Sequence, residues 1–150
     1  TIAHYHHITF INDSKGTSAE ATEKALRAYK ERPLYWILGG RAKTSGISSL
    51  KPYFPLISHA FLFGEAAPEF AEILKGHVSY THCFTLEKAT KAAVELAFKN
   101  PLPNLVILFS PSCVSFDQFR NFEERGEAFC RYVKNIISDP QKNLLLQKNP

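Results

Sequence analysis

The stretch ITFINDSKGTS, residues 8–18, decides which fold the sequence favours. Its first part, Ile8–Asn12, is a short run rich in β-branched and aromatic side chains, which is typical of a strand. Polar residues and Gly16 follow, as in a loop, and Thr17 with Glu20 has the spacing of a capping box at a helix start. The stretch therefore predicts a strand that passes through a polar loop into a helix.

The same order of strand and helix recurs along the chain. Four more strand-like runs are bounded by Gly, Pro, Asn or Asp: Leu34–Leu38, Ala60–Phe63, Val78–Phe84 and Leu105–Ser110. Two helical faces are marked by Leu86, Ala89, Ala93, Leu96 and Ala97 and, in the longest helix, by Phe119, Phe122, Phe129, Val133 and Ile136. This alternation predicts an α/β fold, a Rossmann-like, doubly wound, mainly parallel six-stranded sheet with helices on both faces. Residues 1–6 are expected to supply one short antiparallel strand.

Several residues mark where helices begin. Pro68 suits a first helical turn, Thr85 is an expected N-cap, and Ser115 with Gln118 has the spacing of a second capping box. Gly126 lies inside the last helical pattern, where Gly costs about 1 kcal/mol relative to Ala. Its presence there predicts close packing or a break in the helix.

Composition and charge narrow the classes of function. The 150 residues suffice for one domain, and the net charge of +4 comes from 18 basic and 14 acidic residues spread along the chain. That spread predicts no nucleic-acid-binding stripe and leaves anionic small molecules open. No apolar run reaches the roughly eighteen residues of a membrane span, and the N-terminus is unlike a signal peptide. Because Thr1 is no initiator and Met is absent, we expect a piece of a longer protein.

The cysteines and histidines give weak metal and redox signals. Cys83, Cys113 and Cys130 form no CxxC pair, and their odd number argues against a disulfide framework and a zinc site. Such usage favours a reducing compartment, hence the cytoplasm. His4 and His6 alternate on the first strand without an acidic or Cys partner nearby, so a packing role is favoured over a metal site.

Three loops should meet at one edge of the sheet. In an open α/β sheet, ligands gather at the carboxyl ends of the strands, where Asn12–Ser18, Gly39–Gly46 and Ser110–Phe116 are expected. In the first loop, the amides of a helix N-terminus and Lys15 favour an anion, and the Asp13 carboxylate could accept hydrogen bonds from a ribose. The alternative is that Asp, Ser and Thr merely form the loop and that Thr17 caps the helix.

The other two loops differ in how specific they are. In the second, Lys43 could pair with a carboxylate or phosphate, but a glycine turn with a solvated Lys fits equally well, and the spacing is not that of a phosphate-binding P-loop. The third, SPSCVSFDQFRNFEERG over residues 110–126, mixes Phe, charge and small hydroxyl residues beyond what packing needs. Ser115 at the helix start could meet a carboxylate, whereas Phe119 and Phe122 have the spacing of core residues. The residues alone thus predict an anion-binding α/β domain.

Three motifs in this order carry a family resemblance. FINDSKGTS at 10–18, ILGGRAK at 37–43 and the stretch 110–126 resemble the C-terminal, glutamate-binding domain of MurD-type ligases in the Mur ligase family. The likeness spans nearly all of residues 8–137, and the last motif is its most specific part. It implies an ATP-dependent acid–amino-acid ligase of peptidoglycan biosynthesis, which adds D-glutamate to UDP-N-acetylmuramoyl-L-alanine through an acyl phosphate. The domain would cover residues 1–137, with 138–150 as a mobile tail.

The resemblance also implies roles for individual residues. The substrate-binding residues would be Lys15, Thr17, Lys43, Ser115, Phe116 through its backbone, and Phe122. Asp13 and Lys15 would contact the nucleotide. The chain would contain no catalytic residue and no metal ligand, because the phosphate loop and the Mg2+ ligands of the family lie in a central domain. ATP and Mg2+ would be held mainly there, so this chain alone should be inactive.

The expected partners follow from the same resemblance. They are D-glutamate, UDP-N-acetylmuramoyl-L-alanine and the N-terminal and central domains of the same enzyme, with no nucleic acid, no membrane and a monomeric state. One alternative is a free-standing, non-catalytic α/β module that binds a nucleotide or an acidic metabolite. Another is a neighbouring ligase of the same superfamily that acts on folate or on a different muropeptide.

Overall fold

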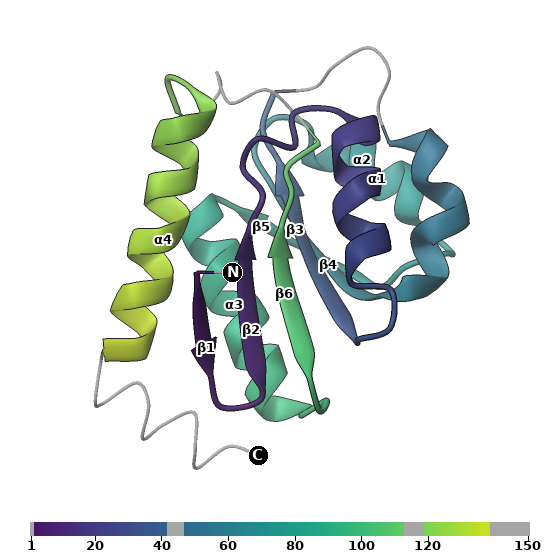
Figure 1. The fold of residues 1–150 in the computed structure, drawn as a ribbon. Coiled ribbons are helices and arrows are strands. Elements are labelled where there is room, and N and C mark those ends of the chain that lie inside the picture. Colours follow the sequence, from purple (N-terminus) through teal and green to yellow (C-terminus); the bar gives the residue numbers. More distant parts are fainter. Residues whose placement is uncertain (1, 42–46, 113–118, 139–150) are drawn as a thin grey trace.

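The computed structural model describes residues 2–41, 47–112 and 119–138, and Figure 1 shows its strands and helices. In chain order they are β1 (Ala3–Tyr5), β2 (Ile8–Asn12), α1 (Ala19–Ala28), β3 (Leu34–Gly39), the 3-10 helix η1 (Ser48–Leu56), β4 (Ile57–Phe63), α2 (Ala67–Leu74), β5 (Tyr80–Phe84), α3 (Leu86–Lys99), β6 (Leu105–Phe109) and α4 (Phe122–Ser138).

The strands form one sheet in the order β1-β2-β6-β3-β4-β5. Only the β1–β2 pair is antiparallel; the other four pairs are parallel, with Asn12 opposite Phe109 at the end of β2 and β6. The predicted fold class and the antiparallel first strand are therefore confirmed. The boundaries shift: β4 begins at Ile57, ahead of the expected Ala60, and β5 begins at Tyr80, after the expected Val78.

Helices cover both faces of the sheet, as Figure 1 shows. Helices α1, η1 and α2 pack against one face around Trp36 and Leu38, and α3 and α4 pack against the other around Tyr35 and Ile37. Because side chains alternate along a strand, β3 supplies both cores and is buried at every position. Among the described residues, no helix is long and apolar enough to cross a membrane.

The caps of the helices confirm two expected starts and correct a third. Thr85 accepts a hydrogen bond from the Lys88 N–H at 3.2 Å and Pro68 lies in the first turn of α2, as predicted. Thr17 is not the cap of α1, because the chain is still extended at Ser18, whose hydroxyl accepts from the Ala21 N–H at 3.3 Å.

The longest helix also begins later than its sequence pattern indicated. Helix α4 starts at Phe122, where the Asn121 side chain accepts from the Glu124 N–H at 2.8 Å. Ser115 and Gln118, the residues of the expected capping box, lie outside the described residues. Phe119 packs against the core, as predicted, but it precedes α4 and does not lie on its face. Phe122, also expected in the core, is half-buried and lines an open groove.

Candidate functional site

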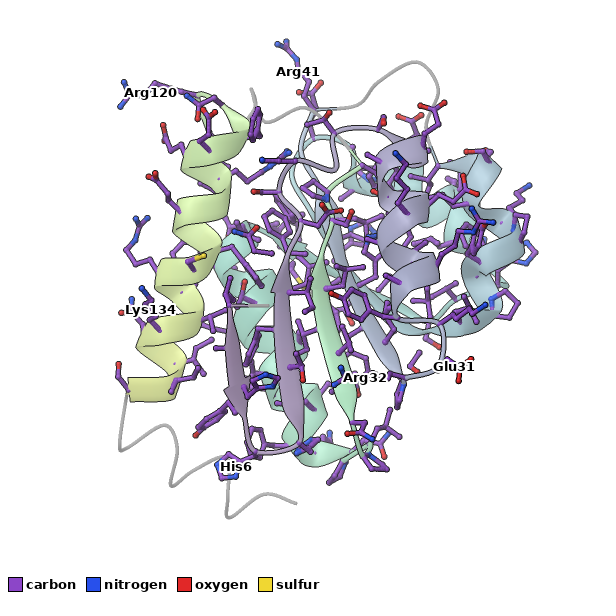
Figure 2. All side chains as sticks on the ribbon, in the orientation of Figure 1. His6, Glu31, Arg32, Arg41, Arg120 and Lys134 are labelled. Carbon is purple, nitrogen blue, oxygen red and sulfur yellow. The ribbon has the colours of Figure 1, made fainter. Side chains whose placement is uncertain are left out.

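The candidate site lies where β2, β6 and β3 end. The chain leaves β2 for α1 on one face of the sheet, and it continues after β6 to α4 on the other face. The carboxyl ends of these two neighbouring strands therefore lie between the two helical layers (Figure 1). Such a crossing point is where α/β sheets bind ligands. Figure 2 places Arg41 and Arg120 at this end of the molecule and His6 and Arg32 at the opposite end.

Local hydrogen bonds shape the loop between β2 and α1. The Asn12 side chain accepts from the Ser14 N–H at 3.1 Å, the Gly16 N–H donates to the Asp13 carbonyl at 2.8 Å, and the Asp13 N–H donates to the Phe109 carbonyl at 2.7 Å. Turn-forming Asn and Asp side chains favour such a compact loop. It leaves Lys15 exposed and Thr17 half-buried just before the N-terminus of α1.

A second segment, residues 110–112 after β6, is tied to this loop. The Ser112 N–H donates to the Gly16 carbonyl at 2.7 Å, and the Gly39 N–H donates to the Pro111 carbonyl at 3.1 Å. Ser110 is fixed as well, because its carbonyl accepts from the Trp36 indole at 2.8 Å. The ends of β2, β3 and β6 are thus joined directly, as the convergence of the three loops predicted.

A buried line of side chains runs beneath both segments. Asp13 accepts from the Ser110 hydroxyl at 2.8 Å, the hydroxyls of Ser110 and Thr22 lie 2.8 Å apart, and those of Thr22 and Ser112 lie 2.6 Å apart. We call these four residues the hydroxyl chain. Thr22 and Ser110 are fully buried and Ser112 is nearly so.

The carboxyl group of Asp13 is half-buried at the open end of the hydroxyl chain. Burial raises its pKa above the usual range, and the hydrogen bond from Ser110 opposes this shift by favouring the ionised form. A carboxylate in this setting retains a strong tendency to accept further hydrogen bonds, because water solvates it only in part.

Helix α4 forms the other wall of the site. The Asn12 amide donates to the Gly126 carbonyl and to the Cys130 sulfur, each at 3.4 Å. A Cβ on Gly126 would collide with the Ser14 hydroxyl and lie 3.2 Å from the Asn12 amide nitrogen. The close packing predicted at Gly126 is confirmed by these short distances. The alternative, a break in the helix, is not found, because α4 continues through this residue.

An open groove of about 590 Å³ lies between α4 and the β2–α1 loop. Lys15, Phe122, Cys130 and Lys134 are among the residues that line it. Below it, the fully buried Arg125 donates to the Ser14 carbonyl at 3.1 Å, and its guanidinium lies 5.9 Å from the centre of the Phe109 ring. Arg125 therefore brings a positive charge under the loop that carries Asp13 and Lys15.

The residues implied by the resemblance fall into two groups. The structure places Asp13, Lys15 and Thr17 on one loop, and it places Phe122 across the groove from Lys15. Lys43, Ser115 and Phe116 lie outside the described residues, as does Cys113.

His4, in β1, and His6, in the turn after it, make packing contacts. His4 shares a hydrogen bond of 3.1 Å with the Thr9 hydroxyl, and His6 packs edge-on against Tyr5 and Phe98. Within residues 2–41, 47–112 and 119–138, no group of three or more His, Cys, Asp or Glu side chains could hold a metal ion.

Sequence reasoning did not single out Thr22, and it gave no role to Ser110 or Arg125, although both lie in the motif at residues 110–126. Ser110 and Thr22 meet across 88 positions of the chain, so no local pattern joins them. One signal was present: Thr22 lies one helical turn from Leu26, on the buried face of α1, where an unpaired hydroxyl would be costly. A hydroxyl there indicates a buried partner.

Both a family model and curated proteins match this chain. The Mur ligase, glutamate ligase domain family matches residues 1–113. A UDP-N-acetylmuramoylalanine–D-glutamate ligase of Paramagnetospirillum magneticum is 52% identical over 129 residues, covering 86% of this chain and 28% of the relative. Ligases of the same name from Rhodopseudomonas palustris and from the Wolbachia of Brugia malayi are 55% and 48% identical, covering 80% and 86% of this chain and 25% of each relative. The chain thus spans about a quarter of the length of these curated relatives.

Proposed function

The chain belongs to the Mur ligase family, and we propose that it is the glutamate-binding domain of an ATP-dependent enzyme that joins D-glutamate to UDP-N-acetylmuramoyl-L-alanine. One observation carries the proposal: the hydrogen bond from the Ser112 N–H to the Gly16 carbonyl joins two family motifs at the carboxyl edge of the sheet. The relatives' shared name favours this function over a free-standing binding module and over a ligase for folate or another muropeptide.

D-glutamate suits the residues at this edge. The amino acid carries two carboxylates, which favour cations and free N–H groups, and Lys15 is exposed beside the N-terminus of α1. Thr17 adds a hydroxyl, and Phe122 offers an apolar surface across the groove for the methylene groups. Lys43, Ser115 and the Phe116 backbone complete the proposed substrate-binding set from outside the described residues.

The nucleotide would meet this chain at Asp13 and Lys15. Ser110 occupies one carboxylate oxygen of Asp13, and among the described residues no donor contacts the other, which fits acceptance from ribose hydroxyls. ATP supplies the phosphoryl group that activates the alanine carboxylate as an acyl phosphate. The proposed central domain would hold most of the ATP and the Mg2+, an ion that proteins usually bind through one or two carboxylates together with substrate phosphates.

The task of this chain is then to bind and orient. A cation on each glutamate carboxylate fixes the amino acid at two points, so that its amine faces the activated carbonyl. Such alignment lowers the barrier without a proton-transferring side chain from this domain. We propose that the enzyme works as a cytoplasmic monomer with its N-terminal and central domains, and the free thiols of Cys83 and Cys130 support a reducing compartment.

Kinetics of the full-length enzyme test the proposal. Lys43→Ala and Ser115→Ala should raise KM for D-glutamate, with Lys43 having the larger effect, since losing a hydrogen bond to a charged group costs on the order of 1.5–3 kcal/mol, roughly ten- to more than hundredfold. KM for ATP should change little. Lys24→Ala, which removes an exposed cation from α1, is the matched control and should leave both constants unchanged. A wild-type enzyme that releases no ADP in response to D-glutamate would refute the function.

A further inference from the structure

Thr22 links the two halves of the site from a fully buried position and is not among the residues proposed to contact a substrate. Its hydroxyl lies 2.8 Å from that of Ser110 and 2.6 Å from that of Ser112. We infer that Thr22 is a positioning residue, which couples Asp13 on the nucleotide side to Ser112, the last described residue before the proposed glutamate-binding residues in the sequence. The inference rests on the proposed function, because it needs two substrates at this edge of the sheet.

The hydrogen bonds of the hydroxyl chain have one direction. Each hydroxyl can donate once, and an ionised carboxylate can only accept. Because the Ser110 hydroxyl donates its proton to Asp13, Thr22 must donate to Ser110. Ser112 must in turn donate to Thr22. Thr22 is therefore the only described residue whose side chain both supports the donor to Asp13 and accepts from Ser112.

Backbone restraints make the hydroxyl chain stiff. The Ser110 N–H donates to the Ile37 carbonyl at 3.2 Å, and the Ser110 carbonyl accepts from the Trp36 indole at 2.8 Å. These two bonds restrict any movement of the Ser110 backbone that a substitution at Thr22 would favour. Thr22 itself is fully buried, and its N–H donates to Ser18 at 3.1 Å within α1. Loss of the Thr22 hydroxyl would consequently weaken the hydrogen bonding of Ser110 to Asp13 and remove the acceptor of the Ser112 hydroxyl.

Ser112 has a backbone conformation that needs this support. Its φ of 57° lies in the left-handed region, which residues other than Gly rarely adopt. Only two described contacts of Ser112 are polar: its N–H donates to Gly16, and its hydroxyl donates to Thr22. Ser115 and Phe116, which are proposed to bind D-glutamate, follow Ser112 closely in the sequence. Thr22 thus helps to hold the left-handed backbone of Ser112 in place.

The test uses the full-length ligase with Thr22→Val and Thr22→Ser. Valine keeps the branched shape but removes the hydroxyl, whereas serine keeps the hydroxyl. Thr90→Val is the matched control, because Thr90 is also fully buried and its hydroxyl donates at 2.8 Å to Leu86 within α3, on the other face of the sheet. ADP release is measured with D-glutamate and ATP varied separately, together with the melting temperature of each variant.

We expect Thr22→Val to lower kcat/KM for both D-glutamate and ATP by roughly three- to thirtyfold, as loss of one or two buried hydrogen bonds would predict. Thr22→Ser should restore most of the activity. Thr90→Val should lower the melting temperature while both KM values stay at their wild-type level.

Three outcomes distinguish a positioning role of Thr22 from a purely structural one and from failure of the proposed function. If Thr22→Val melts earlier, as Thr90→Val does, but keeps wild-type kinetics for both substrates, Thr22 is only structural and the inference is overturned. If Thr22→Val does not fold, Ser112→Ala decides, since it removes the next donor: a raised KM for D-glutamate supports the coupling, and an unchanged one refutes it. If the wild-type enzyme does not use D-glutamate, the proposed function itself fails.

Discussion

Asp13 illustrates a conflict between folding and binding. Burial raises the pKa of its carboxyl, which means that the fold disfavours the ionised form relative to the unfolded chain. Its contribution to stability is therefore fully present below the unfolded pKa of about 4 and is lost as pH rises through the higher folded pKa. At neutral pH the fold carries this carboxylate at a cost, as sites that bind ligands often do.

We predict that Asp13→Asn raises the melting temperature at pH 7 and weakens ATP binding. The amide can still accept from Ser110, but it carries no charge to desolvate. The stability advantage of the variant should shrink as pH falls toward 4, where the wild-type carboxyl becomes protonated in both states. Melting curves from pH 4 to pH 7 and KM for ATP measure the two effects. An advantage that grows on acidification would contradict the sign of this linkage.

The two described cysteines should differ in reactivity. Burial raises the pKa of the Cys83 thiol to about 11, so at pH 8 roughly one molecule in a thousand carries its thiolate. Cys130 is half-buried and lines the open groove beside Asn12. Iodoacetamide at pH 8 should label Cys130 well before Cys83, as followed by peptide mass spectrometry. Equal labelling is expected only in denaturant, and equal rates in the folded protein would show that Cys83 is accessible.

Helix α4 gives a prediction about packing. Gly126→Ala should gain about 1 kcal/mol of helix propensity and still lower the melting temperature, because the new methyl group collides with Ser14. The β2–α1 loop that carries Asp13 and Lys15 must then move, so kcat/KM should fall as well.

Gly76 provides the contrast for that measurement. A Cβ there meets no atom within 4 Å, but the φ of 80° makes any side chain strained. Gly76→Ala should therefore lower the melting temperature, by about 1–2 kcal/mol in unfolding free energy, and leave kcat/KM unchanged. If both variants lose activity in proportion to stability, the contact between Gly126 and the loop has no special role.

How far the sequence predicts each element depends on how local its cause is. The strands β2 and β6 and the helix α3 follow from short apolar runs and from a cap at Thr85, all of which neighbouring residues determine. The start of α1 was missed by one residue, because Thr17 and Ser18 are both good caps and only the extended backbone at Ser18 decides between them. Asp13, Lys15 and Thr17 were predictable as one loop for the same local reason.

The hydroxyl chain depends on the arrangement of the sheet. Ser110 follows β6, and β6 lies beside β2 only because the chain returns from β5 through α3. Thr22 and Arg125 look like ordinary helical residues in the sequence, and their hydrogen bonds to the strand ends form only when α1 and α4 flank those ends. Long-range contacts of this kind require the topology as well as the pattern.

The last prediction concerns the 150-residue chain by itself. Its sequence contains no GxxxxGK[ST] loop, and its described part contains no cluster of acidic side chains for a metal, whereas phosphoryl transfer relies on such groups to stabilise the developing charge. We expect the purified chain to melt cooperatively, because its two cores lie on one continuous sheet, and yet to release no ADP above a protein-free blank. The full-length ligase, assayed beside it with ATP, D-glutamate and UDP-N-acetylmuramoyl-L-alanine, is the positive control. ADP release by the isolated chain that saturates with D-glutamate would show that the domain does more than bind and orient.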